Sequence, residues 1–290
     1  MKPISLTKTM PWLLGASAVF TLAFSQNVSA QNSSSQTASV KRVQNTQANQ
    51  YTSRMDYLNK SAKGAIGDPT AKLPTNDGLY DYHDQVNAYL YRNEPLGSEK
   101  SRYEINYALG EPKVFNDPTL KDDQNSFYND YAYFSMATWQ TFNEAEERNG
   151  HESPSNYQNN PQVDLGNGIS AYKVITDADG DYEYSLVWYQ GPYEITVTNN
   201  NMSGESNDPQ TWSETITLAK KNIEALKQFP LPQTNGGGII IDQDHTNITW
   251  QDGNRVYNSF VSVPNRAMFY NTKYKVDILK SNLKMVNSIQ

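Results

Sequence analysis

Two short motifs constrain the fold of this chain more than any other feature of its sequence. The first lies in "YSLVWYQGPYEITV" at 184–197, and the second lies in "TNITWQDGNRVY" at 246–257. Each places Trp-x-x-Gly between two stretches in which apolar and polar residues alternate, a pattern typical of half-buried strands. We therefore predict two tight β-hairpins, with Gly191 and Gly253 at turn positions that need a positive φ.

The aromatic residues of these hairpins allow two interpretations. In the first, the tryptophans close the strands before the turns and cover the core against the returning strand. In the second, rings with polar tips form an exposed platform that grips sugars or peptides. We favour the first, because the 20 tyrosines of the chain suit half-buried strands. The candidate binding residues under the second interpretation are Trp188, Tyr189, Tyr193, Trp250 and Tyr257.

An amphipathic segment separates the two hairpins. Asp208 and Pro209 form a typical N-cap and first helical residue, and Phe229-Pro230 marks the end of the segment. Apolar residues between these ends follow a single helical stripe. The sequence therefore predicts a long amphipathic helix at about 209–229. The stripe consists of Trp212, Ile216, Ala219, Ile223 and Leu226.

Further strands surround this helix. Alternation predicts strands at 101–109 and 128–140, and Asp179-Gly180 predicts another tight turn, with Gly180 as its turn residue. The similar meanders at 169–198 and 238–262 suggest an internal duplication on either side of the long helix. We therefore expect an α+β fold, made mostly of antiparallel β-meanders with helices packed on the sheet.

Shorter helices are expected in three places. Helical spacing of Val86, Tyr89 and Leu90 predicts a helix within 81–95. A short helix at 143–150 has an asparagine at its start as candidate cap. The stretch 52–74 is ambiguous, with a short helix that ends near glycine 67 as one interpretation.

The N-terminal 30 residues have the pattern of a secretory signal peptide. Lys2 and Lys8 precede an apolar stretch at 11–24, and Val28-Ser29-Ala30 offers the small residues that signal peptidase accepts. The apolar stretch is shorter than the roughly 20 residues that span a bilayer. We therefore predict cleavage after Ala30 and an extracellular protein. Membrane attachment is expected only if this segment stays uncleaved.

Domain limits follow from composition. Residues 31–75 begin with Gln, Asn, Ser and Thr and contain few apolar side chains, so we predict a low-complexity and largely disordered tether there. A single α+β domain is expected at 76–276. The remaining segment at 277–290 is left open as a last strand or helix.

The order of the motifs resembles one group of proteins. A Trp-x-x-Gly hairpin, an amphipathic helix, a Leu-Pro loop, a Gly-rich strand and a second hairpin together resemble uncharacterised secreted proteins of lactic-acid bacteria. The similarity covers about Tyr103 to Ser262. The resemblance implies an extracellular protein of unassigned role, and it implies no catalytic residue.

Charge and composition exclude several functions. A net charge of −7 and the lack of a basic cluster argue against nucleic acid as a partner. The chain has no cysteine, which excludes disulfides, thiol catalysis and cysteine-ligated zinc. It also has no Gly-x-Ser-x-Gly elbow, P-loop or dinucleotide fingerprint. The sequence therefore predicts no cofactor, with Ca²⁺ as the one alternative.

Three features suggest special chemistry but have ordinary explanations. Asp177, Asp179 and Asp181 alternate as calcium ligands do, yet a hairpin turn explains them without a metal. "LPQTN" at 231–235 resembles a sortase signal, but no apolar span and basic tail follow it. The three histidines are far apart in sequence and are expected in polar loops.

The leading hypothesis is therefore a non-catalytic, secreted or surface-associated protein that binds cell-wall polymer, polysaccharide or another surface protein. It rests on the export signal, the tether, the excess of tyrosine and the missing catalytic motifs. Two alternatives stay open. One is a secreted glycan hydrolase that uses a pair of carboxyl groups, and the other is a structural protein of the cell envelope.

Overall fold

A computed structural model describes residues 53–79, 83–121, 130–149, 152–178, 181–203, 207–262 and 277–289. The predicted signal segment and residues 31–52 of the predicted tether therefore lie outside the described residues. Within these ranges, no helix combines the length and the apolar character that crossing a membrane requires.

Ten strands and four α-helices make up the described part of the chain. The helices are α2 (Arg54–Ile66), α4 (Phe142–Arg148), α5 (Pro209–Gln228) and α7 (Ile278–Asn287), and short 3₁₀ segments are η1 (His83–Gln85), η2 (Pro118–Leu120) and η3 (Pro154–Asn156). The strands are β1 (Val86–Arg92), β2 (Ser101–Leu109), β3 (Asp130–Thr138), β4 (Gln162–Gly166), β5 (Ile169–Ala178), β6 (Asp181–Gln190), β7 (Tyr193–Ser203), β8 (Gly237–Ile241), β9 (His245–Asp252) and β10 (Arg255–Ser262).

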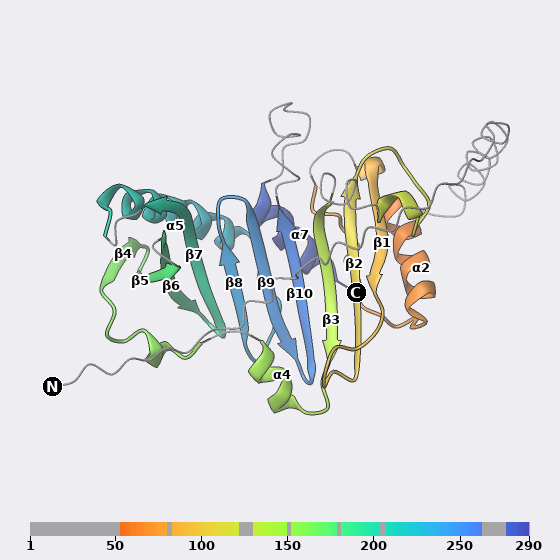
Figure 1. The fold of residues 1–290 in the computed structure, drawn as a ribbon, viewed down its shortest axis with the longest axis horizontal. Helices are drawn as coiled ribbons and strands as arrows, with labels where there is room; N and C mark the ends of the chain where they lie inside the picture. The colour runs from red at the N-terminus through yellow and green to blue at the C-terminus, as the bar shows by residue number, and fades with distance from the viewer. Residues whose placement is uncertain are drawn as a thin grey trace, which may run out of the picture. The chain divides into compact units, whose positions relative to one another are not determined.

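All ten strands belong to one sheet (Figure 1). Their order is β1-β2-β3-β10-β9-β8-β7-β6-β5-β4. Every neighbouring pair is antiparallel except β7 and β8. The protein is therefore a sheet-rich α+β fold with mostly antiparallel pairing, as the alternating sequence patterns predict.

The parallel pair arises from the helix between the two hairpins. Parallel neighbours need a crossover connection, because the chain must return to the end of the sheet at which the first strand began. Helix α5 provides this connection between β7 and β8, and it packs on β6 and β7. Its first turn is capped by Asp208, whose carboxylate accepts hydrogen bonds from the backbone N–H groups of Gln210 and Thr211.

Three helices cover one face of the sheet and bury one continuous core. Helix α2 packs on β1, α7 packs on β9 and β10, and α5 packs on β6 and β7. Figure 1 shows α5 and α7 on the same side of the sheet. Apolar side chains of all three helices belong to a single buried cluster with the inward residues of the strands. The domain therefore extends beyond the predicted limits of 76–276, since it includes α2 before them and α7 after them.

Both predicted hairpins form, and the glycine in each turn has the positive φ that the sequence predicts. Gly191 has φ 59° and Gly253 has φ 61°, values that residues with a Cβ atom resist. In the second hairpin, Asp252 pairs with Arg255, so Gly253-Asn254 forms the two-residue turn. This turn lies one residue later than the Asp-Gly pair in the sequence indicates. The Asp179-Gly180 turn lies outside the described residues, although its flanking residues Ala178 and Asp181 are paired.

Several sequence-based expectations need correction. The helix predicted within 81–95 is wrong, because Val86–Arg92 is strand β1. The short helix near 143–150 begins at Phe142, with Thr141 rather than Asn143 as its cap. Strand β4 was not anticipated. The tether predicted for 31–75 does not extend that far, since α2 is helical and contributes to the core, and the segment at 277–290 contains α7.

Candidate functional site

The structure separates the five candidate binding residues into two groups. Four of the rings are buried, with exposed fractions of 2% for Trp188, Tyr193 and Tyr257 and 5% for Trp250. A buried ring has no face on which a sugar could stack, so burial supports the packing interpretation of the Trp-x-x-Gly motifs. Tyr189 alone in this set is partly exposed.

The tip of the β6–β7 hairpin separates two hollows, which we call the acidic hollow and the proline hollow. Gly191 and Pro192 line both of them. The side chains on either side of the tip alternate between the faces of the sheet. Tyr193 therefore faces the helices and the proline hollow, whereas Tyr189 and its cross-strand partner Glu194 face the opposite side.

The acidic hollow has a volume of about 510 Å³ and combines carboxylates with apolar surface. Helix α4 contributes two exposed glutamates from its last turns. A capping box fixes the start of this helix, because the Thr141 hydroxyl accepts from the Glu144 N–H and the Glu144 carboxylate accepts from the Thr141 N–H. The hollow is lined by Glu146, Glu147, Glu152, Ser153, Pro154, Tyr189, Gly191, Pro192 and Asn235.

A buried carboxylate fixes the tyrosine in the wall of the acidic hollow. The Tyr189 hydroxyl lies 3.1 Å from Glu194 Oε2 and 3.0 Å from the backbone oxygen of Glu152. Glu194 also accepts from the Glu152 N–H at 2.8 Å and from the Tyr157 hydroxyl at 3.5 Å. Burial, reinforced by the Glu194 charge, raises the pKa of Tyr189. The phenol therefore stays protonated and holds its ring in one orientation.

The proline hollow has a volume of about 830 Å³ and lies between the hairpin tip and the loop from α5 to β8. This loop contains the "LPQTN" sequence at 231–235, and four of its apolar residues line the hollow: Phe229, Pro230, Leu231 and Pro232. The Tyr193 hydroxyl donates to the backbone oxygen of Pro232 at 2.8 Å. A side chain at Gly237 would overlap the Tyr193 ring, so this glycine is needed for the tyrosine to reach the loop.

The carboxyl groups with raised pKa values lie away from both hollows. Burial raises the pKa of Asp130 to about 6 and also raises the pKa of Glu183. Neither residue lines the acidic or the proline hollow. A glycosidase needs a protonated carboxylic acid beside the scissile bond. The described acids of raised pKa are therefore not placed to act as that acid at either hollow.

The predicted calcium ligands and histidines add little to a site. Asp177 is exposed, whereas Asp179 and the side chain of Asp181 lie outside the described residues. Among the described side chains, no group of three or more potential ligands could hold a metal ion. His83 and His245 each contact a buried aspartate, at 2.8 Å from Asp77 and 2.6 Å from Asp242 respectively.

Sequence reasoning missed the glutamates of the site. Glu194 occupies a strand position between two inward-facing residues, where alternation predicts a solvated side chain. It is buried because residues 152–157, which are distant in sequence, cover that face of the hairpin. The placement of this carboxylate between two tyrosine hydroxyls depends on tertiary contacts. The pattern of residues along a single strand therefore cannot predict it.

The chain matches no protein-family model, no curated protein and no solved structure.

Proposed function

We propose that this protein is secreted or held at the cell surface, where it binds a polysaccharide without cleaving it. The observation that carries the proposal is the fixed Tyr189 ring in the wall of the acidic hollow, beside three glutamates. Sugars present apolar C–H faces and many hydroxyl groups. A tyrosine ring and proline surface suit the first, and carboxylate oxygens are strong acceptors for the second. The export signal of the sequence supports the location.

Charge favours one class of polysaccharide over another. Glu146, Glu147 and Glu152 concentrate negative charge around the acidic hollow, and the whole chain carries a net charge of −7. A phosphate-bearing wall polymer would place like charges together, which disfavours binding. The proposed ligand is therefore a neutral or amine-bearing polysaccharide.

The experiment compares binding of the purified protein to isolated cell walls and to neutral and phosphate-bearing polysaccharides. Tyr189→Ala should weaken binding to the neutral polymer by about tenfold, or about 1.4 kcal/mol. Tyr189→Phe should bind less tightly than the wild type but more tightly than Tyr189→Ala, because it keeps the ring and loses the hydrogen bonds that fix it. Tyr91→Ala is the matched control, because Tyr91 is exposed and lines neither hollow.

Three results would contradict the proposal. Unchanged binding by Tyr189→Ala would remove the acidic hollow as the site. Release of soluble sugar, abolished by Glu147→Gln or Glu152→Gln, would instead identify a glycan hydrolase. Preference for the phosphate-bearing polymer would reverse the charge argument.

A further inference from the structure

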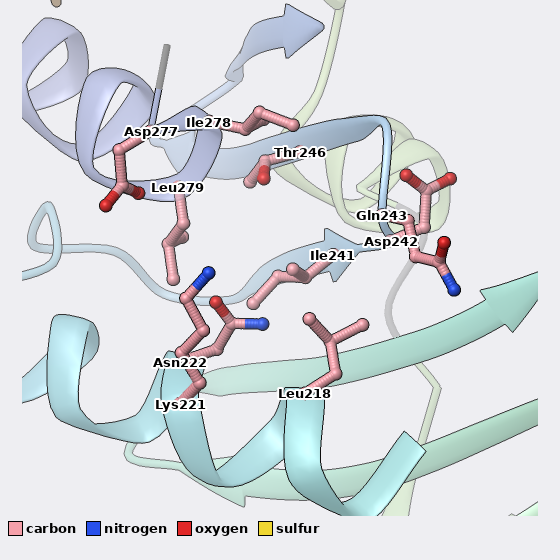
Figure 2. Close-up of a pocket in the computed structure, with 10 residues that line it drawn as sticks. All are labelled: Leu218, Lys221, Asn222, Ile241, Asp242, Gln243, Thr246, Asp277, Ile278 and Leu279. Atoms are coloured by element: carbon pink, nitrogen blue, oxygen red, sulfur yellow. The ribbon is translucent and has the colours of Figure 1, made fainter. Parts of the chain in front are cut away.

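A third pocket lies on the helix-covered face of the sheet, where the β8–β9 turn meets α5 and the start of α7 (Figure 2). Its volume is about 380 Å³. It shares no lining residue with the two hollows at the hairpin tip. Leu218 of α5, Ile241 of β8, and Ile278 and Leu279 of α7 give it aliphatic walls.

Two buried polar side chains that line this pocket each carry an atom without a hydrogen-bond partner among the described residues. Asn222 is 7% exposed and Thr246 is fully buried. Neither Asn222 Nδ2 nor Thr246 Oγ1 has a partner among the described residues. Leaving such a group unpaired costs about 1–3 kcal/mol. Thr246 shares the inward face of β9 with Ile248 and Trp250, so an aliphatic residue would suit the position better for stability alone.

A lysine adds a positive charge beside these two groups. Figure 2 shows the Lys221 amino group and the Asn222 amide extending from α5 toward Leu279 and Ile241. Lys221 has no ion pair within the described part of the chain. The pocket therefore offers an ammonium, an amide N–H and a hydroxyl that have no acceptor within the part of the chain that the structure describes.

The carboxylates that line the pocket are already engaged. Asp242 contacts His245 Nδ1 at 2.6 Å and accepts from the backbone N–H groups of Asp244 and His245. Asp277 caps α7 and pairs with Lys280 at 3.3 Å. These two acids hold the turn and the helix end. The Gln243 amide is engaged as well, since its Nε2 donates to Asn199 Oδ1 at 2.8 Å. Among the described residues, the groups left for a ligand are the Lys221 amino group, Asn222 Nδ2 and Thr246 Oγ1, and each can donate a hydrogen bond.

We infer that this pocket binds a short-chain aliphatic carboxylate. Its oxygens accept from Asn222 and Thr246, and its charge is balanced by Lys221. Charge-assisted hydrogen bonds of this kind are the strong ones. The hydrocarbon chain packs against the aliphatic walls, in the mixture of apolar lining and few polar groups that is typical of small-molecule sites.

The test follows the Asn222 side-chain amide by nuclear magnetic resonance while pentanoate is added to the purified protein. Pentanoate should shift this signal saturably, together with the backbone amides of Thr246 and Leu279. Pentanamide, which has the same chain without the charge, should bind about tenfold more weakly. Lys221→Met should abolish that difference, whereas Lys220→Met should preserve it because Lys220 does not line the pocket.

Thr246→Val separates binding from folding. The substitution keeps the shape of the side chain and removes an unpaired buried hydroxyl, so the melting temperature should stay the same or rise, while pentanoate binding falls about tenfold. The inference is overturned if pentanoate gives no saturable shift, if pentanamide binds equally well, or if Thr246→Val binds pentanoate like the wild type.

Discussion

Trp250 lies against Tyr257 across the β9–β10 hairpin, with ring centroids 5.2 Å apart and ring planes inclined by 12°. The two residues are direct cross-strand partners, and both are buried. Phe134 of β3 packs beside them, with its ring centroid 6.3 Å from each. The tryptophan of the motif thus continues an aromatic row over three strands, and Gly253 turns the chain so that the rings can meet.

Gly253→Val should destabilise the protein by about 1–3 kcal/mol, because a β-branched residue strains a turn position with φ 61°. Urea unfolding measures the change. Gly253→Asn is the control and should lower the free energy of unfolding by less, since asparagine tolerates a positive φ. Equal stability of wild type and Gly253→Val would rule out the strained turn.

Gly237→Ala should cost about 1–3 kcal/mol through overpacking. A Cβ atom at this position would overlap the Tyr193 ring and come within 2.8 Å of the Thr249 backbone oxygen. The neighbouring Gly238 has open space around its Cβ position, so Gly238→Ala should leave the melting temperature nearly unchanged. If the two variants melt together, the close approach of Tyr193 to β8 does not exist in solution.

Trp212→Ala should lower the free energy of unfolding by about 3–5 kcal/mol. The ring is buried, meets Tyr184 edge to face with centroids 5.0 Å apart, and lies 4.3 Å from the Lys173 amino group. Ile216→Ala, at a partly buried position of the same helix, should lose less. Calorimetry that finds similar losses for both would place Trp212 outside the core.

Stability should depend on pH through Asp130. Its carboxylate accepts from the Tyr89 hydroxyl at 2.6 Å and from Asn106 at 3.1 Å, yet burial still raises its pKa to about 6. The folded state therefore binds the proton more tightly than the unfolded chain, whose carboxyl pKa is about 3.9. This contribution to stability is present below pH 4 and is lost as the pH rises through about 6.

Asp130→Asn should remove that dependence. Urea unfolding of both proteins between pH 4 and 7 gives the difference curve, in which the contributions of other groups cancel. We expect the wild type to lose on the order of 2 kcal/mol relative to the variant across this range. Parallel curves would mean that Asp130 titrates normally in the folded state.

The strands next to clear turn signals could be predicted from sequence, but β1 could not. Val86, Ala88 and Leu90 face the helices, and Tyr89 on the other face is buried against Ala108 and Leu120. Because both faces of the strand are covered, the apolar positions do not simply alternate. Val86, Tyr89 and Leu90 then fit the spacing of a helix equally well.

The proposed ligand sites were harder to predict from sequence than the fold. Residues 152–157 and the hairpin are joined only by tertiary contacts around Glu194. One signal for the third pocket was available, since Thr246 interrupts the inward apolar positions of β9 and Asn222 lies beside the apolar stripe of α5. A polar residue in an apolar register indicates either a packing partner or a ligand, and only the structure distinguishes them.

Iodide quenching of tryptophan fluorescence tests most directly whether the motif tryptophans build the core. A protein prepared without residues 1–30 contains four tryptophans, and the structure buries all of them: Trp139, Trp188, Trp212 and Trp250. We predict weak quenching of the native protein, strong quenching in denaturant, and no change when polysaccharide is added. Native quenching as strong as in denaturant, and reduced by the polysaccharide, would contradict this account and make the indoles a ligand platform.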